Sequence, residues 1–171
     1  MKYYIKTFGC QMNGHDSERI AAVLQNRGYL KTENAEDAGV IVINTCCVRE
    51  NAENRVYGHL GHLKHIKEKN KEVKIAVCGC MAQCENAVKK ISEAYKNVDL
   101  VFGTFNIDAF PKLLDECIAT GKTVVEINKS RSVPERVYES VRENKYKGSV
   151  NIIYGCDNYC SYCVVPYVRG R

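Results

Sequence analysis

The sequence contains no apolar run that approaches the roughly 20 residues needed to span a bilayer. Its first nine residues carry lysines on both sides of a short apolar stretch and lack the longer apolar run of a signal peptide. No GxGxxG motif follows that stretch, so the phosphate-binding fingerprint of a dinucleotide fold is absent. These absences predict a cytoplasmic protein with no membrane contact, and they give no reason to expect NAD.

The composition suits a globular protein with an unusual number of thiols. The chain has 171 residues, of which 45% are hydrophobic, enough for one domain with a core and a short extension. It contains ten cysteines. Because disulfides are reduced in the cytoplasm, so many cysteines favour metal binding or catalysis.

The positive charge is unevenly distributed. The formal net charge is +5, but residues 1–127 contribute only +1, while residues 128–148 contribute +3. A basic stretch gives mild support for a nucleic-acid partner. An ordinary solvated linker would have the same composition.

Strand-like and helix-like stretches alternate through residues 1–127. Asn13 is a good helix N-cap, and Asp16 adds a carboxylate three residues later. The alternation predicts an α/β fold: a parallel sheet with helices on both faces. Strands are expected at 2–8, 40–43, 73–78, 99–103 and 122–127, and helices at 13–27, 48–69, 83–95 and 107–120.

The remaining residues divide into a linker and the start of a second domain. Residues 128–148 are polar, with a possible helical turn at 135–144, and residues 149–154 read as a new strand. We expect residues 149–171 to open a domain that this chain truncates. Its apolar residues would then need another surface, so we expect the stretch after about residue 130 to be disordered or to pack against a neighbouring chain.

Three cysteines near the end form a CxxxCxxC pattern: Cys156, Cys160 and Cys163. Thiolates normally hold all four irons of a [4Fe–4S] cluster. Three thiolates would leave the fourth iron open to a substrate or cofactor. A structural zinc site prefers four ligands, usually in two CxxC pairs, and no second pair follows here. Zinc or a chance run remain the alternatives.

Three further cysteines occupy equivalent places in the α/β unit. Cys10, Cys46 and Cys80 each follow a predicted strand and precede a predicted helix. Carboxyl ends of parallel strands gather along one edge of a sheet, and helix amino-termini stabilise thiolates. We therefore expect the three thiols to converge there and hold a second cluster. The alternative is that they are small buried core residues.

Four cysteines remain, and they divide into two pairs. Cys78, within a strand, and Cys117, within a helix, are expected to point into apolar packing. Cys47 and Cys84 lie beside the proposed ligands, and either could replace one of them.

Five motifs carry a resemblance that runs from end to end of the chain. They are TFGCQMN at 7–13, NTCCVRE at 44–50, GCMAQ at 79–83, VFGT at 101–104 and YGCDNYCSYCVVPYVRGR at 154–171. Together they resemble the methylthiotransferase family of the radical S-adenosylmethionine superfamily. Tyr162 matches the aromatic residue that the superfamily usually has before its third cysteine.

The resemblance implies two [4Fe–4S] clusters and S-adenosyl-L-methionine as cofactors. An auxiliary cluster that supplies or carries sulfur would be held by Cys10, Cys46 and Cys80. The cluster that binds and cleaves S-adenosylmethionine would be held by Cys156, Cys160 and Cys163, with Tyr162 at the cofactor. The implied partners are a tRNA substrate and an electron donor protein. A radical barrel and a small RNA-binding barrel would follow in such proteins.

The Gln11-Met12 pair after the first cysteine resembles the branch that methylthiolates C2 of N6-isopentenyladenosine next to the anticodon. The runner-up is the branch that acts on threonylcarbamoyladenosine, which usually has lysine there. A rival of another class is a non-catalytic iron–sulfur or zinc module. Because most of the barrel would be missing, we expect this chain alone to be inactive.

Overall fold

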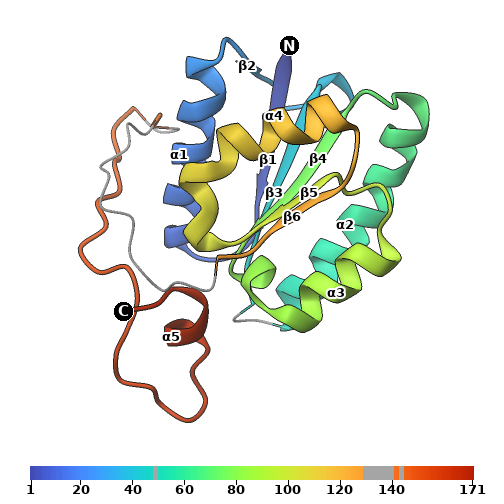
Figure 1. Cartoon of the computed structure of the whole chain (residues 1–171). Helices are drawn as coiled ribbons and strands as arrows, with labels where there is room; N and C mark the ends of the chain where they lie inside the picture. Colours follow the sequence, from blue (N-terminus) through green and yellow to red (C-terminus); the bar gives the residue numbers. More distant parts are fainter. Residues whose placement is uncertain (48–49, 129–140, 143–144) are drawn as a thin grey trace.

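A computed structural model describes residues 1–47, 50–128, 141–142 and 145–171, without the side chains of 50–52. Six parallel strands form one sheet in the spatial order 2-1-3-4-5-6 (Figure 1). The predicted α/β class is therefore confirmed. The strands are β1 (Lys2–Thr7), β2 (Leu30–Lys31), β3 (Val40–Thr45), β4 (Lys74–Gly79), β5 (Leu100–Phe102) and β6 (Val124–Glu126).

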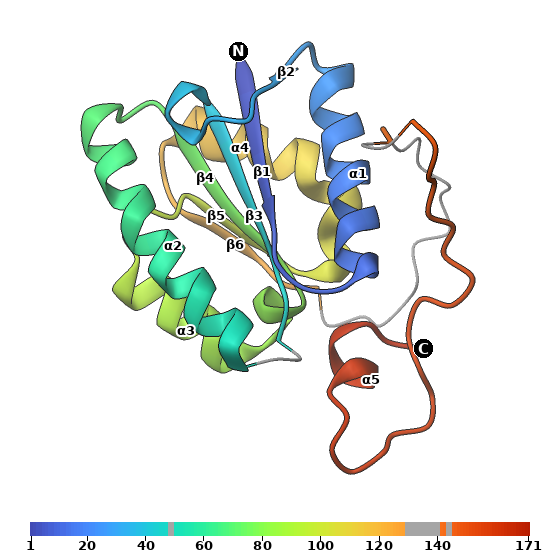
Figure 2. The same cartoon turned by 180° about the vertical axis from the view of Figure 1, so that it is seen from behind.

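Helices cover both faces of this sheet, as predicted. The α-helices are α1 (Gln11–Asn26), α2 (Glu50–Lys69), α3 (Glu85–Ala94), α4 (Phe110–Thr120) and the short α5 (Val165–Val168). Three 3₁₀ turns join them: η1 (Ala35–Asp37), η2 (Cys80–Gln83) and η3 (Thr104–Ala109). Helices α1 and α4 cover one face, and α2 and α3 cover the other (Figures 1 and 2). Within the described residues, no helix has the length and apolar character needed to cross a membrane.

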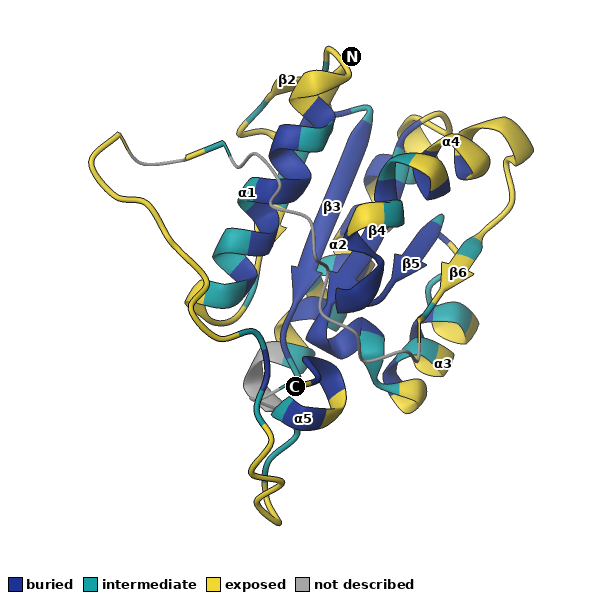
Figure 3. Ribbon diagram, turned by 60° about the vertical axis from the view of Figure 1, so that its left-hand side comes forward, coloured by how far each residue is buried: buried dark blue, intermediate teal, exposed yellow. Residues whose placement is uncertain are grey.

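The core lies on both sides of β3, whose six residues are all buried (Figure 3). Ile41 and Ile43 pack into the cluster formed with α2 and α3, whereas Val40 and Val42 pack into the one formed with α1 and α4. Side chains alternate between the two faces of a strand, so a strand covered on both faces must be apolar throughout. The continuous apolar run in the sequence is explained by this double burial.

The start of the first helix differs from the prediction. Helix α1 begins at Gln11 with Cys10 as its N-cap, and Asn13 lies inside the helix with a fully buried side chain. Gly9 is the physical reason, because its φ of +123° lets the chain turn from β1 directly into the helix. The side chain of Asn13 is thereby released for contacts outside the helix.

The predicted strand at 149–154 is wrong: the structure contains no strand there. Val150, Ile152 and Ile153 are 84%, 90% and 68% exposed. A strand needs a neighbour to satisfy its backbone hydrogen bonds, and no described strand pairs with this stretch. The possible helical turn at 135–144 falls almost wholly outside the described residues.

Candidate functional site

The carboxyl ends of β1, β3 and β4 lie side by side at one edge of the sheet. These strands are adjacent and parallel, with Thr45 of β3 level with Gly79 of β4. Cys46 and Cys80 follow their strands at once, and Cys10 follows β1 after two residues. The prediction that the strands carrying these cysteines end at the same edge is confirmed.

Two glycines make the turns that bring these loops together. A Cβ on Gly9 would lie 2.6 Å from Cβ and 3.1 Å from Sγ of Cys46. Gly79 has a φ of +93°, and a Cβ there would lie 2.4 Å from the backbone oxygen of Thr45. A side chain at either position would therefore push the cysteine loops apart.

The buried side chain of Asn13 lies at the centre of this edge. Its Oδ1 is 3.6 Å from Sγ of Cys10 and 3.8 Å from Sγ of Cys80, so both thiols contact the same oxygen. Its Nδ2 donates to the backbone oxygens of Phe8, at 3.1 Å, and Thr45, at 2.7 Å. Asn13 therefore joins the loops that follow three different strands, a role that its sequence position did not reveal.

Cys47 and Cys84 join Cys80 in a group of three thiols. Hydrogen bonds to Cys80 and Cys84 raise the pKa of the Cys47 thiol far above its usual value. The bond from Cys47 lowers the pKa of the Cys80 thiol to about 6, and the guanidinium of Arg169 acts in the same direction against the effect of burial. The lowered pKa favours the thiolate form of Cys80, which is the form that binds metals.

Cys78 and Cys117 point into apolar packing, as predicted. Both belong to the core cluster beneath α1 and α4. Burial raises the pKa of each thiol, most strongly for Cys78. Neither thiol therefore belongs to the group at the carboxyl edge.

The CxxxCxxC segment forms a loop whose two ends meet. The backbone N–H of Cys156 donates to the oxygen of Gly170 at 2.9 Å, and that of Cys163 donates to the oxygen of Cys160 at 2.9 Å. Gly155 lies so close to Gly170 that a Cβ would come within 1.8 Å of its oxygen. Cys156 and Cys163 are half-buried and Cys160 is exposed.

The segment around this loop packs against its own domain. The Tyr154 hydroxyl donates to the backbone oxygen of Thr104 at 3.1 Å, and the Thr104 hydroxyl donates to that of Val168 at 2.6 Å. Helix α5 contacts η2, beside the carboxyl edge of the sheet (Figure 1). The expectation that this part of the chain finds no surface on its own domain is therefore wrong for residues 154–171. The exposed Tyr162, at 91%, lies within the loop.

Arg169 connects this segment to the cysteine edge, and sequence reasoning gave it no role. It is 4% exposed and donates to Oδ2 of Asp16 at 2.5 Å, to Oδ1 of Asn13 at 2.9 Å and to Sγ of Cys80 at 3.2 Å. Burial raises the pKa of the Asp16 carboxyl, and Arg169 opposes this effect. The only available signal was the place of Arg169 within the last motif.

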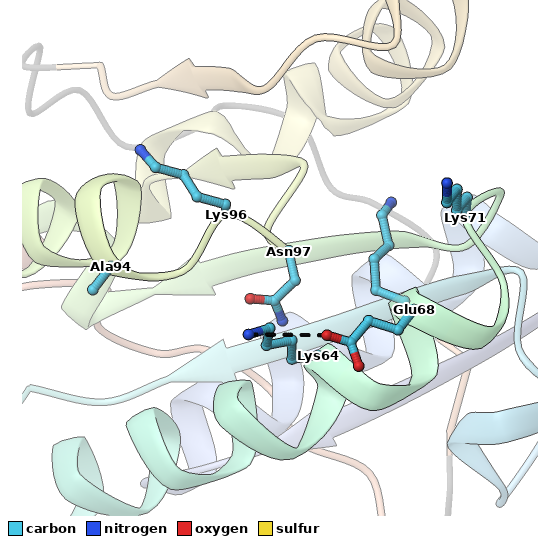
Figure 4. Close-up of a pocket in the computed structure, with 7 residues that line it drawn as sticks. Lys64, Glu68, Lys71, Ala94, Lys96 and Asn97 are labelled. Atoms are coloured by element: carbon cyan, nitrogen blue, oxygen red, sulfur yellow. Dashed lines mark ion pairs between the residues drawn. The ribbon is translucent and has the colours of Figure 1, made fainter.

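A hollow lies at the opposite, amino edge of the sheet, between the end of α2 and the segment that follows α3 (Figure 4). Its volume is about 380 Å³. Lys64, one of several lysines around it, lies 3.9 Å from Glu68. Lys67 is bound to both carboxylate oxygens of Asp99 at 2.8 Å, so its charge is already neutralised. No cysteine lines this hollow.

The thiols at the carboxyl edge fit an iron–sulfur cluster in their chemistry and location. They follow three adjacent strands, Cys10 is the N-cap of α1, and the pKa of Cys80 is lowered, which favours its metal-binding form. Thiolates are the usual ligands of such clusters. Among the residues that the structure describes, no three His, Cys, Asp or Glu side chains already surround a metal position. Ligands of this kind commonly complete their geometry on binding.

Comparisons with known proteins agree with the motifs. Residues 2–103 match the model of a family described as "Uncharacterized protein family UPF0004". The chain is 50% identical over 170 residues to the tRNA-2-methylthio-N(6)-dimethylallyladenosine synthase of Alkaliphilus oremlandii, and 49% identical over 171 residues to that of Bacillus subtilis. Each match covers 99% of this chain, but only 36% and 33% of these relatives.

The chain thus spans about a third of the length of the curated relatives that it matches. The matched family region contains the edge with Cys10, Cys46 and Cys80. The relatives also align over the segment with Cys156, Cys160 and Cys163, since nearly the whole chain is covered. The resemblance seen in the motifs is confirmed, and the chain belongs to the UPF0004 family.

Proposed function

We propose that this chain takes part in methylthiolation of C2 of N6-isopentenyladenosine, next to the anticodon of tRNA, by radical S-adenosylmethionine chemistry. The observation that carries the proposal is that the segment with the second cysteine set packs, through α5 and Arg169, against the edge of the sheet with the first set. One set follows β1, β3 and β4, and the other lies on the loop that precedes α5, the helix that packs against η2. A reaction that adds sulfur to a carbon needs both a sulfur source and a means of removing hydrogen, and the two sets divide these tasks.

The first set would hold the auxiliary cluster. Cys10, Cys46 and Cys80 provide three thiols, and the lowered pKa of Cys80 favours its metal-binding form. Asn13 and the glycines before Cys10 and Cys80 keep the three loops in place. Cys47 and Cys84 are close enough to Cys80 to compete as ligands.

The second set would hold the cluster that binds S-adenosylmethionine. Cys156, Cys160 and Cys163 leave one iron open, which suits a cofactor that must coordinate the cluster. The exposure of Cys160 and Tyr162 leaves room for that cofactor on the outer side of the loop. When bound, the two clusters and S-adenosylmethionine would supply the radical, the sulfur and the methyl group.

The names of the relatives support the substrate. Relatives about 50% identical to this chain are named as synthases of 2-methylthio-N(6)-dimethylallyladenosine in tRNA. The proposed partners are accordingly a tRNA and an electron donor protein, and the proposed location is the cytoplasm. The basic stretch at 128–148 is compatible with a nucleic-acid partner.

The cluster assignment is tested by anaerobic reconstitution with iron and sulfide, followed by iron analysis and electron paramagnetic resonance. We expect about eight irons per chain, and about four after either Cys10, Cys46 and Cys80 or Cys156, Cys160 and Cys163 are replaced by alanine. Cys117→Ala is the matched control and should retain about eight. Zinc without iron would instead support a non-catalytic module.

The reaction itself is tested with isopentenyladenosine-containing tRNA and nucleoside mass spectrometry. We expect no methylthiolated product from the 171-residue chain, because it spans only about a third of the length of the relatives named for this product. A chain extended to the length of the relatives should form the product. If the extended chain modified only threonylcarbamoyladenosine, the substrate assignment would be wrong.

A further inference from the structure

Arg169 makes more specific contacts than an ordinary buried ion pair requires. Its three guanidinium nitrogens each contact a different partner: Asp16, Asn13 and Cys80. A guanidinium presents its donors in a rigid fork, so three simultaneous contacts fix both its position and its orientation. The side chains of Arg169 and Asp16 are 5% and 1% exposed, so water has little access to the pair.

Arg169 contacts the first cysteine set and adjoins the loop that carries the second. Its Nε donates to the sulfur of Cys80, at the end of β4. The next residue, Gly170, accepts the backbone N–H of Cys156 and so closes the CxxxCxxC loop. One residue therefore touches a thiol of the first set and is bonded to the residue that closes the loop of the second.

Simpler accounts explain only part of this arrangement. A clamp for the chain end needs only the Asp16 carboxylate, which neutralises the charge. The bond to sulfur uses a donor that the clamp does not require. Hydrogen bonds to a ligand sulfur are also a known means of setting the potential of an iron–sulfur cluster.

We propose that Arg169 is a positioning residue that fixes the CxxxCxxC loop against the auxiliary site and, through its N–H···S bond to Cys80, raises the reduction potential of the auxiliary cluster. The second part rests on the proposed function, because it takes Cys80 as a cluster ligand. The first part does not, because the contacts to Asp16 and Asn13 are independent of metal.

The first experiment measures amide hydrogen exchange in the metal-free protein. For Arg169→Met, exchange of the Cys156 and Val168–Gly170 amides should be at least about tenfold faster, since removing one partner of a buried pair is costly. Arg171→Met is the matched control, because Arg171 lies two residues away in a 76% exposed pair with Asp157. If Arg169→Met fails to fold, Asp16→Asn is used in its place. This variant keeps a hydrogen-bond acceptor for Arg169 and should give a smaller increase in the exchange rate of the same amides.

The second experiment measures the midpoint potential of the auxiliary cluster alone. Cys156, Cys160 and Cys163 are replaced by alanine, and the reconstituted protein is titrated with reductant under electron paramagnetic resonance. The potential should shift to a more negative value in Arg169→Met and stay unchanged in Arg171→Met. Compared with Arg169→Met, Arg169→Lys should restore most of the amide protection, because it keeps the positive charge. It should restore only part of the shift in potential, because an ammonium lacks the several fixed donors of a guanidinium.

The outcomes separate this proposal from the proposed function. If the protein without Cys156, Cys160 and Cys163 bound no iron, the assignment of an auxiliary cluster would be refuted. Amide exchange would still test whether Arg169 fixes the CxxxCxxC loop. If iron bound normally but Arg169→Met left both the exchange and the potential unchanged, the role of Arg169 would be refuted while the cluster assignment stood. Faster exchange with an unchanged potential would overturn the bond to sulfur as a determinant of the potential.

Discussion

The two edges of the sheet each contain a cation paired with a carboxylate, but the pairs are built differently. At the amino edge, Lys67 binds both oxygens of Asp99 and also the backbone oxygen of Val73. Asp99 in turn accepts the backbone N–H of Ile75 at 2.8 Å. The paired side chains are 32 positions apart in the sequence, between the end of α2 and the start of β5, and their contacts with Val73 and Ile75 go to backbone. This ion pair holds the end of α2 against the start of β4 and β5.

At the carboxyl edge, Arg169 and Asp16 come from opposite ends of the chain, 153 positions apart. Their other contacts go to side chains, among them a thiol. An ion pair whose remaining hydrogen bonds go to nearby backbone groups stabilises the fold locally. An ion pair whose remaining hydrogen bonds go to distant side chains holds one segment of the chain against another. The difference indicates that the carboxyl-edge pair joins distant segments of the chain, whereas the amino-edge pair stabilises the fold locally.

The largest expected effect comes from breaking the Arg169–Asp16 pair. Asp16→Ala removes the carboxylate partner of the buried Arg169 guanidinium and should lower the free energy of unfolding by about 3–5 kcal/mol. Asp99→Asn keeps an acceptor for Ile75 at a more exposed site and should cost about 1 kcal/mol. Urea unfolding followed by circular dichroism measures both. Equal losses would contradict the contrast between the edges.

A smaller effect is expected from glycines at the two edges. Gly79→Ala places a side chain at positive φ and against the backbone of Thr45, and should cost more than about 2 kcal/mol. Gly39→Ala, at the amino edge, meets only the flexible side chain of Met1 and should cost less than about 1 kcal/mol. The same unfolding measurement applies. A Gly79→Ala protein as stable as Gly39→Ala would show that the cysteine loops tolerate rearrangement.

The smallest expected effect is the ionisation of a single thiol, that of Cys80, followed by its absorbance. Because the pKa of Cys80 is lowered to about 6, its thiolate should form as the pH rises through 6, whereas ordinary thiols ionise near 9. The difference in thiolate absorbance between the metal-free protein and its Cys80→Ala variant should therefore rise with a midpoint near pH 6. A midpoint near 9 would mean that Cys47 and Arg169 do not stabilise the Cys80 thiolate.

Much of the fold could be predicted because its signals are local. The run Val40–Ile43 indicated a doubly covered strand, and parallel topology then placed Cys10, Cys46 and Cys80 at one edge without knowledge of any contact. Cys117 was recognised as core from its place in an amphipathic helix.

The contacts between distant residues could not be predicted in this way. The role of Asn13 depends on the turn at Gly9, which begins the helix early and directs the amide away from it. Arg169 finds its partners only after the chain has folded back across more than 150 positions. The expected strand at 149–154 failed for the opposite reason: its pattern was local, but a strand requires a neighbour.

The meeting of Gly155 with Gly170 has a consequence for the entropy of metal binding. Closing a flexible loop of this length costs roughly 2 kcal/mol in chain entropy, beyond a constant term. The hydrogen bond from the N–H of Cys156 to the oxygen of Gly170 closes the loop within the polypeptide, so metal binding does not have to supply this entropy. The three cysteines therefore lie on a backbone loop that is already closed before any iron binds. Glycine is required at position 155, because a methyl group there would come within 1.8 Å of the Gly170 oxygen, and it is favoured at 170, where φ is +75°.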